Sequence, residues 1–211
     1  PLFNRAIQGV YELGSTFKIF AIAQALELKL VSPETMINVS GPLRWGKFKI
    51  RDFHNYGSEL PVKKVISKSS NIGTARIAQE IGSIEQQKFL KSLGFFDIVP
   101  LEMVEASGGK PLLPKNWSEL STMTISYGHG LSATPLHLAA AYAAIGNGGY
   151  KVTPTLQIQE NQKYGDRVIS EVVSKQALSM LRSVVTDGTA TMAEVPGYPV
   201  AGKTGTADKP S

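Results

Sequence analysis

Apolar residues recur at helical spacing in several separate blocks of this 211-residue chain, whereas stretches that alternate as strands do are few and short. The first block runs from Ser15 to about Leu30, and its apolar positions are Phe17, Phe20, Ile22, Ala23 and Leu26. Helices therefore outnumber strands, and they form groups instead of alternating with single strands. This arrangement predicts an α+β fold and argues against a parallel α/β sheet.

Further helices are predicted at residues 72–82, 83–94, 134–146 and 174–185 from the same spacing. The third of these has the clearest start, because Thr134 provides a capping hydroxyl and Pro135 fits the first turn. Residues 95–122 contain three prolines and little periodicity, which predicts a long loop. Strands are predicted in three places: a β-ribbon at 48–53, an edge strand at 150–158 that contains Pro154, and a final strand at 198–207.

The charge and composition exclude several classes of function. The net charge of +5 comes from lysines and arginines that are scattered along the chain, without a block of five like charges, so no nucleic-acid partner is expected. The absence of cysteine excludes disulfides, thiol catalysis and cysteine-based zinc sites. His54, His129 and His137 lack the spacing of metal ligands, so neither a metal nor a cofactor is expected. No run of about 18 apolar residues occurs that would cross a membrane.

A candidate nucleophile lies at the start of the first helical block, in the motif Gly14-Ser15-Thr16-Phe17-Lys18. A serine hydroxyl needs a base to react at neutral pH, and a lysine three residues later lies on the same face of a helix. A helix start also directs free backbone N–H groups toward the serine. Alone the pattern is weak, because a capping serine followed by a surface lysine is common.

A second motif, Ser69-Ser70-Asn71, comes just before the helix predicted at 72–82. Its ordinary explanation is helix capping, since serine and asparagine favour helix starts. Its functional interpretation places the Ser69 hydroxyl beside Lys18 as a proton relay. The Asn71 amide would then hydrogen-bond both Lys18 and the backbone of a substrate.

A third motif, Lys203-Thr204-Gly205-Thr206, lies on the final predicted strand. Glycine inside a strand is typical of a close backbone approach, and a ligand peptide could pair along this edge. Lys203 would hold a terminal carboxylate together with the hydroxyls of Thr204 and Thr206. The N–H groups of Thr206 and Ser15 would form an oxyanion hole.

Together and in this order, the three motifs resemble those of penicillin-binding proteins and class A β-lactamases. The chain is most similar to class B penicillin-binding proteins, above all the division-type transpeptidases of Gram-negative bacteria. Segments 50–54, 127–130 and 188–190 share the resemblance, which covers essentially the whole chain, although the family often has proline where Leu13 stands.

The resemblance implies a penicillin-binding protein and serine β-lactamase-like transpeptidase fold. In that fold an antiparallel sheet is flanked by helices, an all-helical lobe lies beside it, and the active site lies between the two. Residues 1–211 are expected to form one transpeptidase, or penicillin-binding, domain that lacks the family's N-terminal module and C-terminal strands. The sheet is therefore expected to be incomplete in this chain.

The resemblance also implies a function and a location. Ser15 would attack a D-alanyl-D-alanine stem peptide of peptidoglycan, Lys18 would accept its proton, and an amine of a second stem would take the acyl group. Burial and the charge of Lys203 are expected to lower the pKa of Lys18. β-Lactams would be covalent inhibitors and division-complex membrane proteins would be partners. The protein would work at the periplasmic face of the inner membrane, anchored by an N-terminal segment outside this chain.

Three other activities use a similar acylation site. A β-lactamase needs a deacylating water, and no Glu-x-x-Leu-Asn segment for it occurs in residues 95–122. A D,D-carboxypeptidase differs only in its acceptor. A β-lactam sensor is a binding module whose receptor helix and signalling domain would lie outside this sequence. The sequence leaves all three open.

Overall fold

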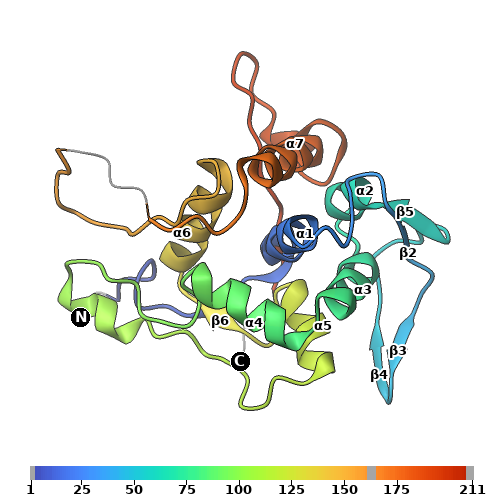
Figure 1. The fold of residues 1–211 in the computed structure, drawn as a ribbon, viewed down its shortest axis with the longest axis horizontal. Coiled ribbons are helices and arrows are strands. Elements are labelled where there is room, and N and C mark those ends of the chain that lie inside the picture. Colours follow the sequence, from blue (N-terminus) through green and yellow to red (C-terminus); the bar gives the residue numbers. More distant parts are fainter. Residues whose placement is uncertain (1–2, 161–164, 208–211) are drawn as a thin grey trace.

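Helix α1 (Lys18–Glu27) lies in the middle of the molecule (Figure 1). The computed structural model describes residues 3–160 and 165–207. Every side chain from Lys18 to Leu26 is buried, because helices from later in the chain pack around α1. No helix within these described ranges combines the length and the apolar character needed to cross a lipid bilayer. The helices that follow α1 are α2 (Val62–Ser67), α3 (Asn71–Ile81), α4 (Ser83–Ser92), α5 (Glu119–Ser126), α6 (Pro135–Gly146) and α7 (Glu171–Asp187).

A cluster of aromatic rings holds the start of α1 against the rest of the core. Phe17 meets Phe20 and Phe95 edge to face at centroid distances of 5.1 and 4.9 Å, and Phe20 meets Phe95 at 5.4 Å. Tyr142 of α6 contacts Phe20 in the same way at 5.5 Å. Because each such pair adds roughly 0.5–1.5 kcal/mol to the free energy of burial, the residues around Ser15 rest on a rigid support.

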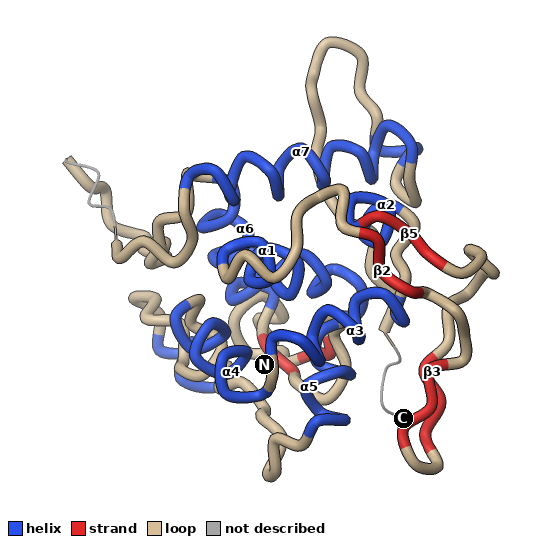
Figure 2. The backbone as a smooth tube through the Cα atoms, turned by 45° about the vertical axis from the view of Figure 1, so that its right-hand side comes forward, coloured by secondary structure: helices blue, strands red, loops and turns tan. Residues whose placement is uncertain are grey.

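The strands form three separate two-stranded antiparallel sheets in the described part of the chain. Strands β3 (Leu43–Trp45) and β4 (Phe48–Ile50) form a hairpin that projects away from the helices (Figures 1 and 2). The ribbon predicted at 48–53 is confirmed only for residues 48–50, because residues 51–53 form no strand. Many helices and a few small antiparallel sheets together confirm the predicted α+β class. The pairs are β1 (Tyr11–Glu12) with β6 (Ser132–Ala133), β2 (Met36–Asn38) with β5 (Glu59–Pro61), and β3 (Leu43–Trp45) with β4 (Phe48–Ile50).

The predicted helix starts are confirmed where capping groups are present. Thr134 accepts a hydrogen bond from the N–H of His137, and the His137 ring lies against the Thr134 N–H, so α6 begins with a reciprocal capping box. Ser70 caps α3 by accepting from the Gly73 N–H at 2.9 Å. The helix predicted at 174–185 is longer than expected, because Ser170 caps α7 one turn earlier.

Two other helices were not predicted. α2 has only six residues, and α5 begins inside the loop predicted at 95–122. The rest of that loop is irregular apart from a 3₁₀ turn at Val104–Gly108 and a β-bridge between Leu112 and Ser132. α5 has the sequence ELSTMTIS, so its helical spacing is hidden among hydroxyl side chains that favour other conformations in isolation.

Two predicted strands are wrong. Of residues 150–158, only Tyr150 forms a β-bridge, with Arg167, because Pro154 has no N–H to donate and no described strand lies alongside. The segment 198–207 carries the third motif but forms no ladder within the described residues beyond a bridge between Val195 and Tyr198. It is attached to α7 instead, where the Gly202 N–H donates to the Leu181 carbonyl at 3.2 Å.

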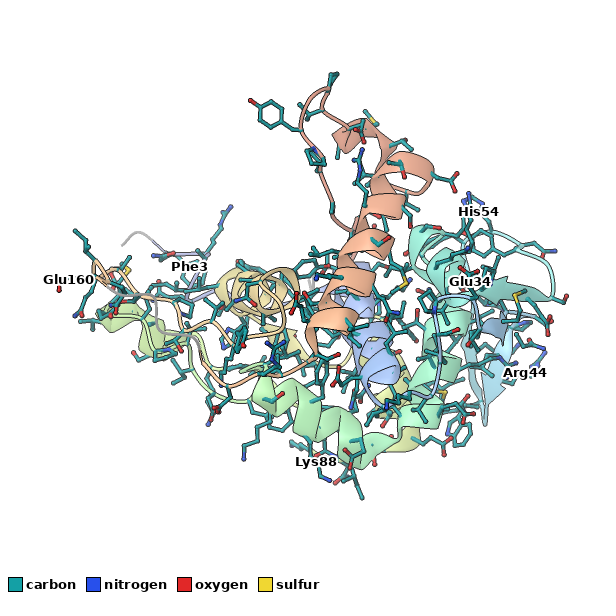
Figure 3. All side chains as sticks on the ribbon, turned by 45° about the horizontal axis from the view of Figure 1, so that its top comes forward. Phe3, Glu34, Arg44, His54, Lys88 and Glu160 are labelled. Carbon is teal, nitrogen blue, oxygen red and sulfur yellow. The ribbon has the colours of Figure 1, made fainter. Side chains whose placement is uncertain are left out.

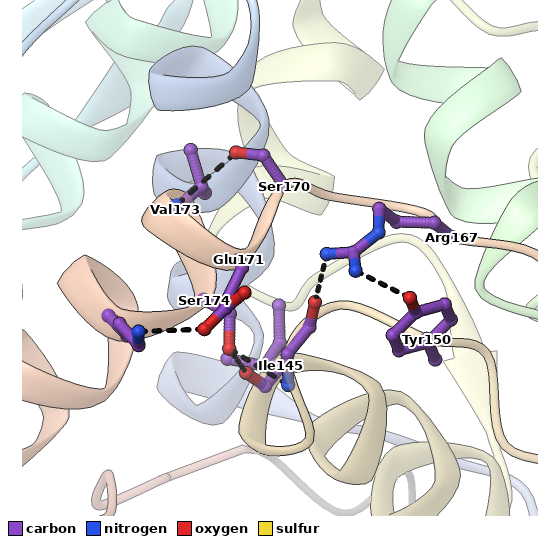
Figure 4. A network of polar contacts seen from close by, with 9 residues as sticks. Ile145, Tyr150, Arg167, Ser170, Glu171, Val173 and Ser174 are labelled. Atoms are coloured by element: carbon purple, nitrogen blue, oxygen red, sulfur yellow. Dashed lines mark hydrogen bonds and ion pairs between the residues drawn. The ribbon is translucent and has the colours of Figure 1, made fainter. Parts of the chain in front are cut away.

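Polar contacts join the end of α6 to the start of α7 (Figure 4). The Ser174 hydroxyl donates to the Ile145 carbonyl at 2.6 Å and accepts from the Gly148 N–H at 3.2 Å. The Arg167 guanidinium donates to the Gly148 carbonyl and to the Tyr150 hydroxyl at 2.7 and 2.6 Å. These bonds hold α7 against the core, and α7 in turn supports the segment with the third motif.

Candidate active site

Ser15 lies in a short 3₁₀ turn, Gly14–Phe17, directly before α1. The α-helix predicted from Ser15 to about Leu30 therefore begins three residues later, at Lys18, and ends at Glu27. Ser15 is half-buried, and its hydroxyl has no hydrogen-bond partner among the described residues. Tyr142 donates to the Thr16 carbonyl at 2.6 Å, which fixes the turn from the side of α6.

Three backbone segments meet at this turn because glycines allow a close approach. Gly14 has a φ of 55°, and a Cβ there would overlap with the carbonyl of Thr206. A Cβ at Gly128 would overlap with the Gly14 carbonyl. The Gly14 N–H donates a hydrogen bond to the Gly128 carbonyl at 3.1 Å. A Cβ at Gly205 would lie 2.7 Å from the Thr16 methyl. The first and third motifs are therefore brought into backbone contact.

Lys18 points from α1 to the second motif. Its ammonium donates to the Ser69 carbonyl at 2.5 Å and to the Ser69 hydroxyl at 2.9 Å. Ser69 has a φ of 61°, a conformation that costs a non-glycine residue roughly 1–2 kcal/mol. The strained residue sits at the centre of the cluster, as is common where function fixes the backbone.

Lys203 of the third motif reaches the same hydroxyl. Its ammonium donates to the Ser69 hydroxyl at 2.9 Å and to the Thr204 carbonyl at 3.1 Å. The Thr204 hydroxyl lies 2.7 Å from that of Thr189, in the segment after α7. One serine oxygen therefore joins two lysines that are 185 positions apart in the sequence.

Burial lowers the pKa of both lysines, and the charge of Lys203 lowers that of Lys18 further. The pKa of Lys18 is lowered to about 7, mainly because its ammonium is removed from water and secondly because Lys203 is positive, while the carboxylate of Asp52 opposes the shift. Burial lowers the pKa of Lys203 to about 8. Close to neutral pH, Lys18 therefore exists partly as a free amine that can accept a proton.

Asp52 holds the second motif in place. Its carboxylate accepts from the Ser70 hydroxyl at 2.6 Å and from the N–H groups of Asn71 and Ile72 at 2.5 and 3.0 Å. A negative group at a helix N-terminus also interacts favourably with the helix dipole. In the sequence Asp52 stands out only as part of the similar segment 50–54, because it is 18 positions from Ser70 and nothing local indicates their contact.

The Asn71 side chain lies in a different contact from the one predicted. Its amide donates to the Arg51 carbonyl at 3.0 Å, and among the described residues it makes no hydrogen bond to Lys18. The reason is that Asp52 pulls the start of α3 toward segment 51–52. The expected Asn71–Lys18 hydrogen bond is therefore absent here.

A further polar contact near Ser15 was missed. Glu12 lies in β1, and its carboxylate accepts from the Gly130 N–H at 2.7 Å and contacts the His129 ring nitrogen Nδ1 at 2.8 Å. This contact ties the strand before the Ser15 turn to the glycine-rich turn after α5. Only the placement of His129 in a glycine-rich loop indicated that it lies near the site.

Residues 1–211 match the family model for the penicillin binding protein transpeptidase domain. The chain therefore belongs to the penicillin-binding protein transpeptidase family, and the resemblance of the motifs is confirmed. A probable peptidoglycan D,D-transpeptidase FtsI of Caulobacter vibrioides is 34% identical, and the peptidoglycan D,D-transpeptidase FtsI of Escherichia coli K12 is 33% identical. Each comparison covers 98% of this chain but only 36% and 35% of the relative, so the chain spans about a third of their length.

Solved structures agree with this assignment. The apo structure of the TP domain of penicillin-binding protein 3 from Burkholderia pseudomallei superposes with a TM-score of 0.91 at 36% identity, over 98% of this chain and 63% of that one. A structure described as a peptidoglycan glycosyltransferase from Burkholderia ambifaria gives 0.91 at 35% identity, over 98% of this chain and 66% of that one. The fold is therefore a partial penicillin-binding protein transpeptidase fold.

Proposed function

We propose that this chain carries the acyl-transfer site of a peptidoglycan D,D-transpeptidase, with Ser15 as nucleophile. The observation that carries the proposal is the junction of Lys18, Ser69 and Lys203, in which a lysine with a pKa of about 7 lies one helical turn from a half-buried serine. The similarity to the relatives from Caulobacter and Escherichia, which are described as a probable peptidoglycan D,D-transpeptidase and a peptidoglycan D,D-transpeptidase, supports the choice of substrate.

In the first half-reaction the Ser15 oxygen attacks the carbonyl carbon of the penultimate D-alanine. Its proton passes to the neutral amine of Lys18, and the C–O bond forms as the carbonyl oxygen becomes an oxyanion. The N–H groups of Ser15 and Thr206 would stabilise this oxyanion, and such donors are worth roughly a hundred- to a thousandfold in rate. The close approach of Gly14 to Thr206 supports this pairing.

The intermediate then collapses. The peptide C–N bond breaks, and the leaving D-alanine takes a proton that Lys18 passes through the Ser69 hydroxyl, leaving an acyl-enzyme on Ser15. Lys18 is neutral again and accepts a proton from the amine of a second stem peptide, which attacks the ester. The Ser15 oxygen leaves and recovers its proton by the same relay, so the product is a crosslink and the enzyme is regenerated.

The third motif would bind the terminal carboxylate of the donor. Lys203 supplies the positive charge, Thr204 and Thr206 supply hydroxyl groups, and Gly205 allows the peptide backbone to approach. Asn71 would contact the donor backbone after its amide leaves the Arg51 carbonyl. A β-lactam presents the same carbonyl and carboxylate, so it would acylate Ser15 and inhibit the enzyme.

The location and partners follow from the same proposal. The substrate is part of the cell wall, so the site would work at the periplasmic face of the inner membrane, attached by a segment outside residues 1–211. Membrane proteins of the division complex would be its partners, as the similarity to FtsI proteins suggests.

The test is covalent labelling with a fluorescent penicillin, followed by intact mass measurement and peptide mapping. One adduct is expected on the peptide that contains Ser15, and none after the substitution Ser15→Ala. Labelling that persists in Ser15→Ala would overturn the proposed nucleophile. Rapid, continuous hydrolysis of nitrocefin would identify a β-lactamase instead, and release of D-alanine without crosslinking would identify a carboxypeptidase.

A further inference from the structure

The β3–β4 hairpin has an unusual concentration of positive charge. Residues 43–51, here called the cationic hairpin, contain Arg44, Lys47, Lys49 and Arg51 and no acidic residue. In the observed register Arg44 lies directly opposite Lys49. Like charges in directly opposed positions destabilise an antiparallel pair, so Arg44 and Lys49 make the hairpin less stable than neutral residues would. Such a local conflict is expected where a residue serves a function.

Within residues 3–160 and 165–207, no acidic side chain forms an ion pair with these charges. Lys47 has a cation–π contact with the Phe48 ring at 5.6 Å. The next acid along the chain, Asp52, already accepts three hydrogen bonds from residues 70–72. Figure 3 shows Arg44 at the outer edge of the molecule, on the same side as His54 and opposite Glu160.

A pocket of about 330 Å³ lies beside the end of the cationic hairpin, and Ile72, which follows the second motif, also lines it. Its lining includes Pro42, Arg51, Asp52, Phe53 and His54, and the Phe53 side chain is 80% exposed. The Arg51 guanidinium is exposed and has no hydrogen-bond partner among the described residues. A guanidinium binds a carboxylate through two parallel hydrogen bonds, and an exposed aromatic ring offers a surface for the aliphatic part of a peptide.

This pocket is directly connected to the candidate active site. The Arg51 carbonyl accepts from the Asn71 amide, and Asp52 caps the helix that begins at Asn71. Asn71 in turn follows Ser69, which contacts both lysines of the site. A peptide that passes the second motif would therefore reach Arg51 within a few residues.

We propose that the cationic hairpin and this pocket form a subsite for an acidic peptide, in which Arg51, assisted by Lys49 and Arg44, binds a side-chain or α-carboxylate of the stem peptide. The inference rests on the proposed transpeptidase function and adds a determinant of substrate specificity to it. The carboxylate belongs to a part of the peptide away from the terminal D-alanine, whose own carboxylate is assigned to Lys203.

The experiment compares stem peptides that differ only in whether their internal carboxylates are free or amidated. The quantity measured is the ratio of KM for the amidated to KM for the free peptide, since an interaction at a distance from the reacting atoms changes binding. For the unaltered protein we expect a ratio of about ten. The triple substitution Arg44→Gln, Lys49→Gln and Arg51→Gln should bring the ratio close to one. The control Lys91→Gln, Lys110→Gln and Lys115→Gln removes the same charge from exposed positions elsewhere and should leave the ratio unchanged.

Two arms separate the possible sources of the carboxylate. In one arm the donor peptide is varied and the acceptor is kept amidated, and in the other arm the reverse is done. A ratio near one in both arms of the unaltered protein, or equal ratios in the triple variant and the unaltered protein, would overturn the subsite. Unchanged ratios combined with loss of binding to anionic phospholipid vesicles in the triple variant would show a membrane contact and also overturn it.

A second variant keeps the result interpretable. Lys49→Glu places opposite charges across the hairpin, so it should raise the melting temperature while it weakens binding of the free-carboxylate peptide. A purely structural role predicts that stability and binding change in the same direction. If the unaltered protein is not acylated by penicillin at all, the proposed function itself fails, which is a different result from a KM ratio of one.

Discussion

The ammonium groups of Lys18 and Lys203 lie at the same distance, 2.9 Å, from one oxygen atom, the hydroxyl oxygen of Ser69. A serine oxygen has two lone pairs and can accept from both lysines while its own proton remains available for donation. Two cations that share one acceptor repel each other, which favours loss of a proton from the more deeply buried one. The protonation states of Lys18 and Lys203 are therefore coupled through this geometry.

The rate of acylation by penicillin should follow a bell-shaped dependence on pH. Lys18 must be neutral to accept the Ser15 proton, so the rate should rise as the pH passes its pKa of about 7. Lys203 must be charged to bind the carboxylate, so the rate should fall as the pH passes about 8. Rapid-mixing measurements between pH 5.5 and 9.5 test this, and the two apparent pKa values belong to the coupled pair. A profile without a rising limb would contradict the role of Lys18.

The substitution Lys203→Gln should move the rising limb of this profile to higher pH. The positive charge of Lys203 lowers the pKa of Lys18, so removal of that charge should let the pKa of Lys18 rise. The position of the limb is the informative quantity, because the overall rate will also fall when the carboxylate contact is lost. A limb that stays in place would show that burial alone sets the pKa of Lys18.

Asp52→Asn should have the opposite effect on the limb, because the Asp52 carboxylate raises the pKa of Lys18. The same change removes a charged cap from α3 and should cost about 1 kcal/mol of stability. Denaturant unfolding and the pH profile measure the two effects. Asp166→Asn, an exposed carboxylate without a described ion pair, is the control and should change neither.

Gly14→Ala should abolish acylation, whereas Gly46→Ala should not. Both glycines have a φ of 55°, so both substitutions carry a conformational cost of roughly 1–2 kcal/mol. Only at Gly14 does the new methyl group overlap with another backbone, that of Thr206, whereas the space around Gly46 is open. Penicillin labelling and thermal melting of the pair separate the two effects, and equal labelling of both variants would be inconsistent with the close approach.

Lys18→Met should inactivate the protein and increase its stability, most of all at acidic pH. Because the pKa of Lys18 falls from 10.5 unfolded to about 7 folded, the unfolded chain binds more protons between these values. The penalty of the buried lysine is therefore complete below pH 7 and disappears as the pH rises toward 10.5. The gain in melting temperature should be larger at pH 6.5 than at pH 9.5, by at least about 2 °C. An equal gain at both values would mean that Lys18 is not destabilised by burial.

The local parts of this fold could be predicted from the sequence. Apolar spacing located α1, α3, α4, α6 and α7, because a helix that buries one face repeats its pattern every 3.6 residues. Capping chemistry located the start at Thr134, since the hydroxyl and its N–H partner lie within one turn. α2 and α5 were missed because one is very short and the other is rich in hydroxyl side chains.

The sequence by itself determined the three motifs, their order and the helix that carries Lys18. Only the tertiary structure decided that Ser69 joins Lys18 to Lys203, that Asp52 caps the second motif, and that the third motif rests on α7 instead of lying in a sheet. The physical reason is the separation in sequence between the residues that interact. Periodicity and capping act over a few residues, whereas these contacts join segments 18 to 134 positions apart and form only when the packing around α1 brings them together.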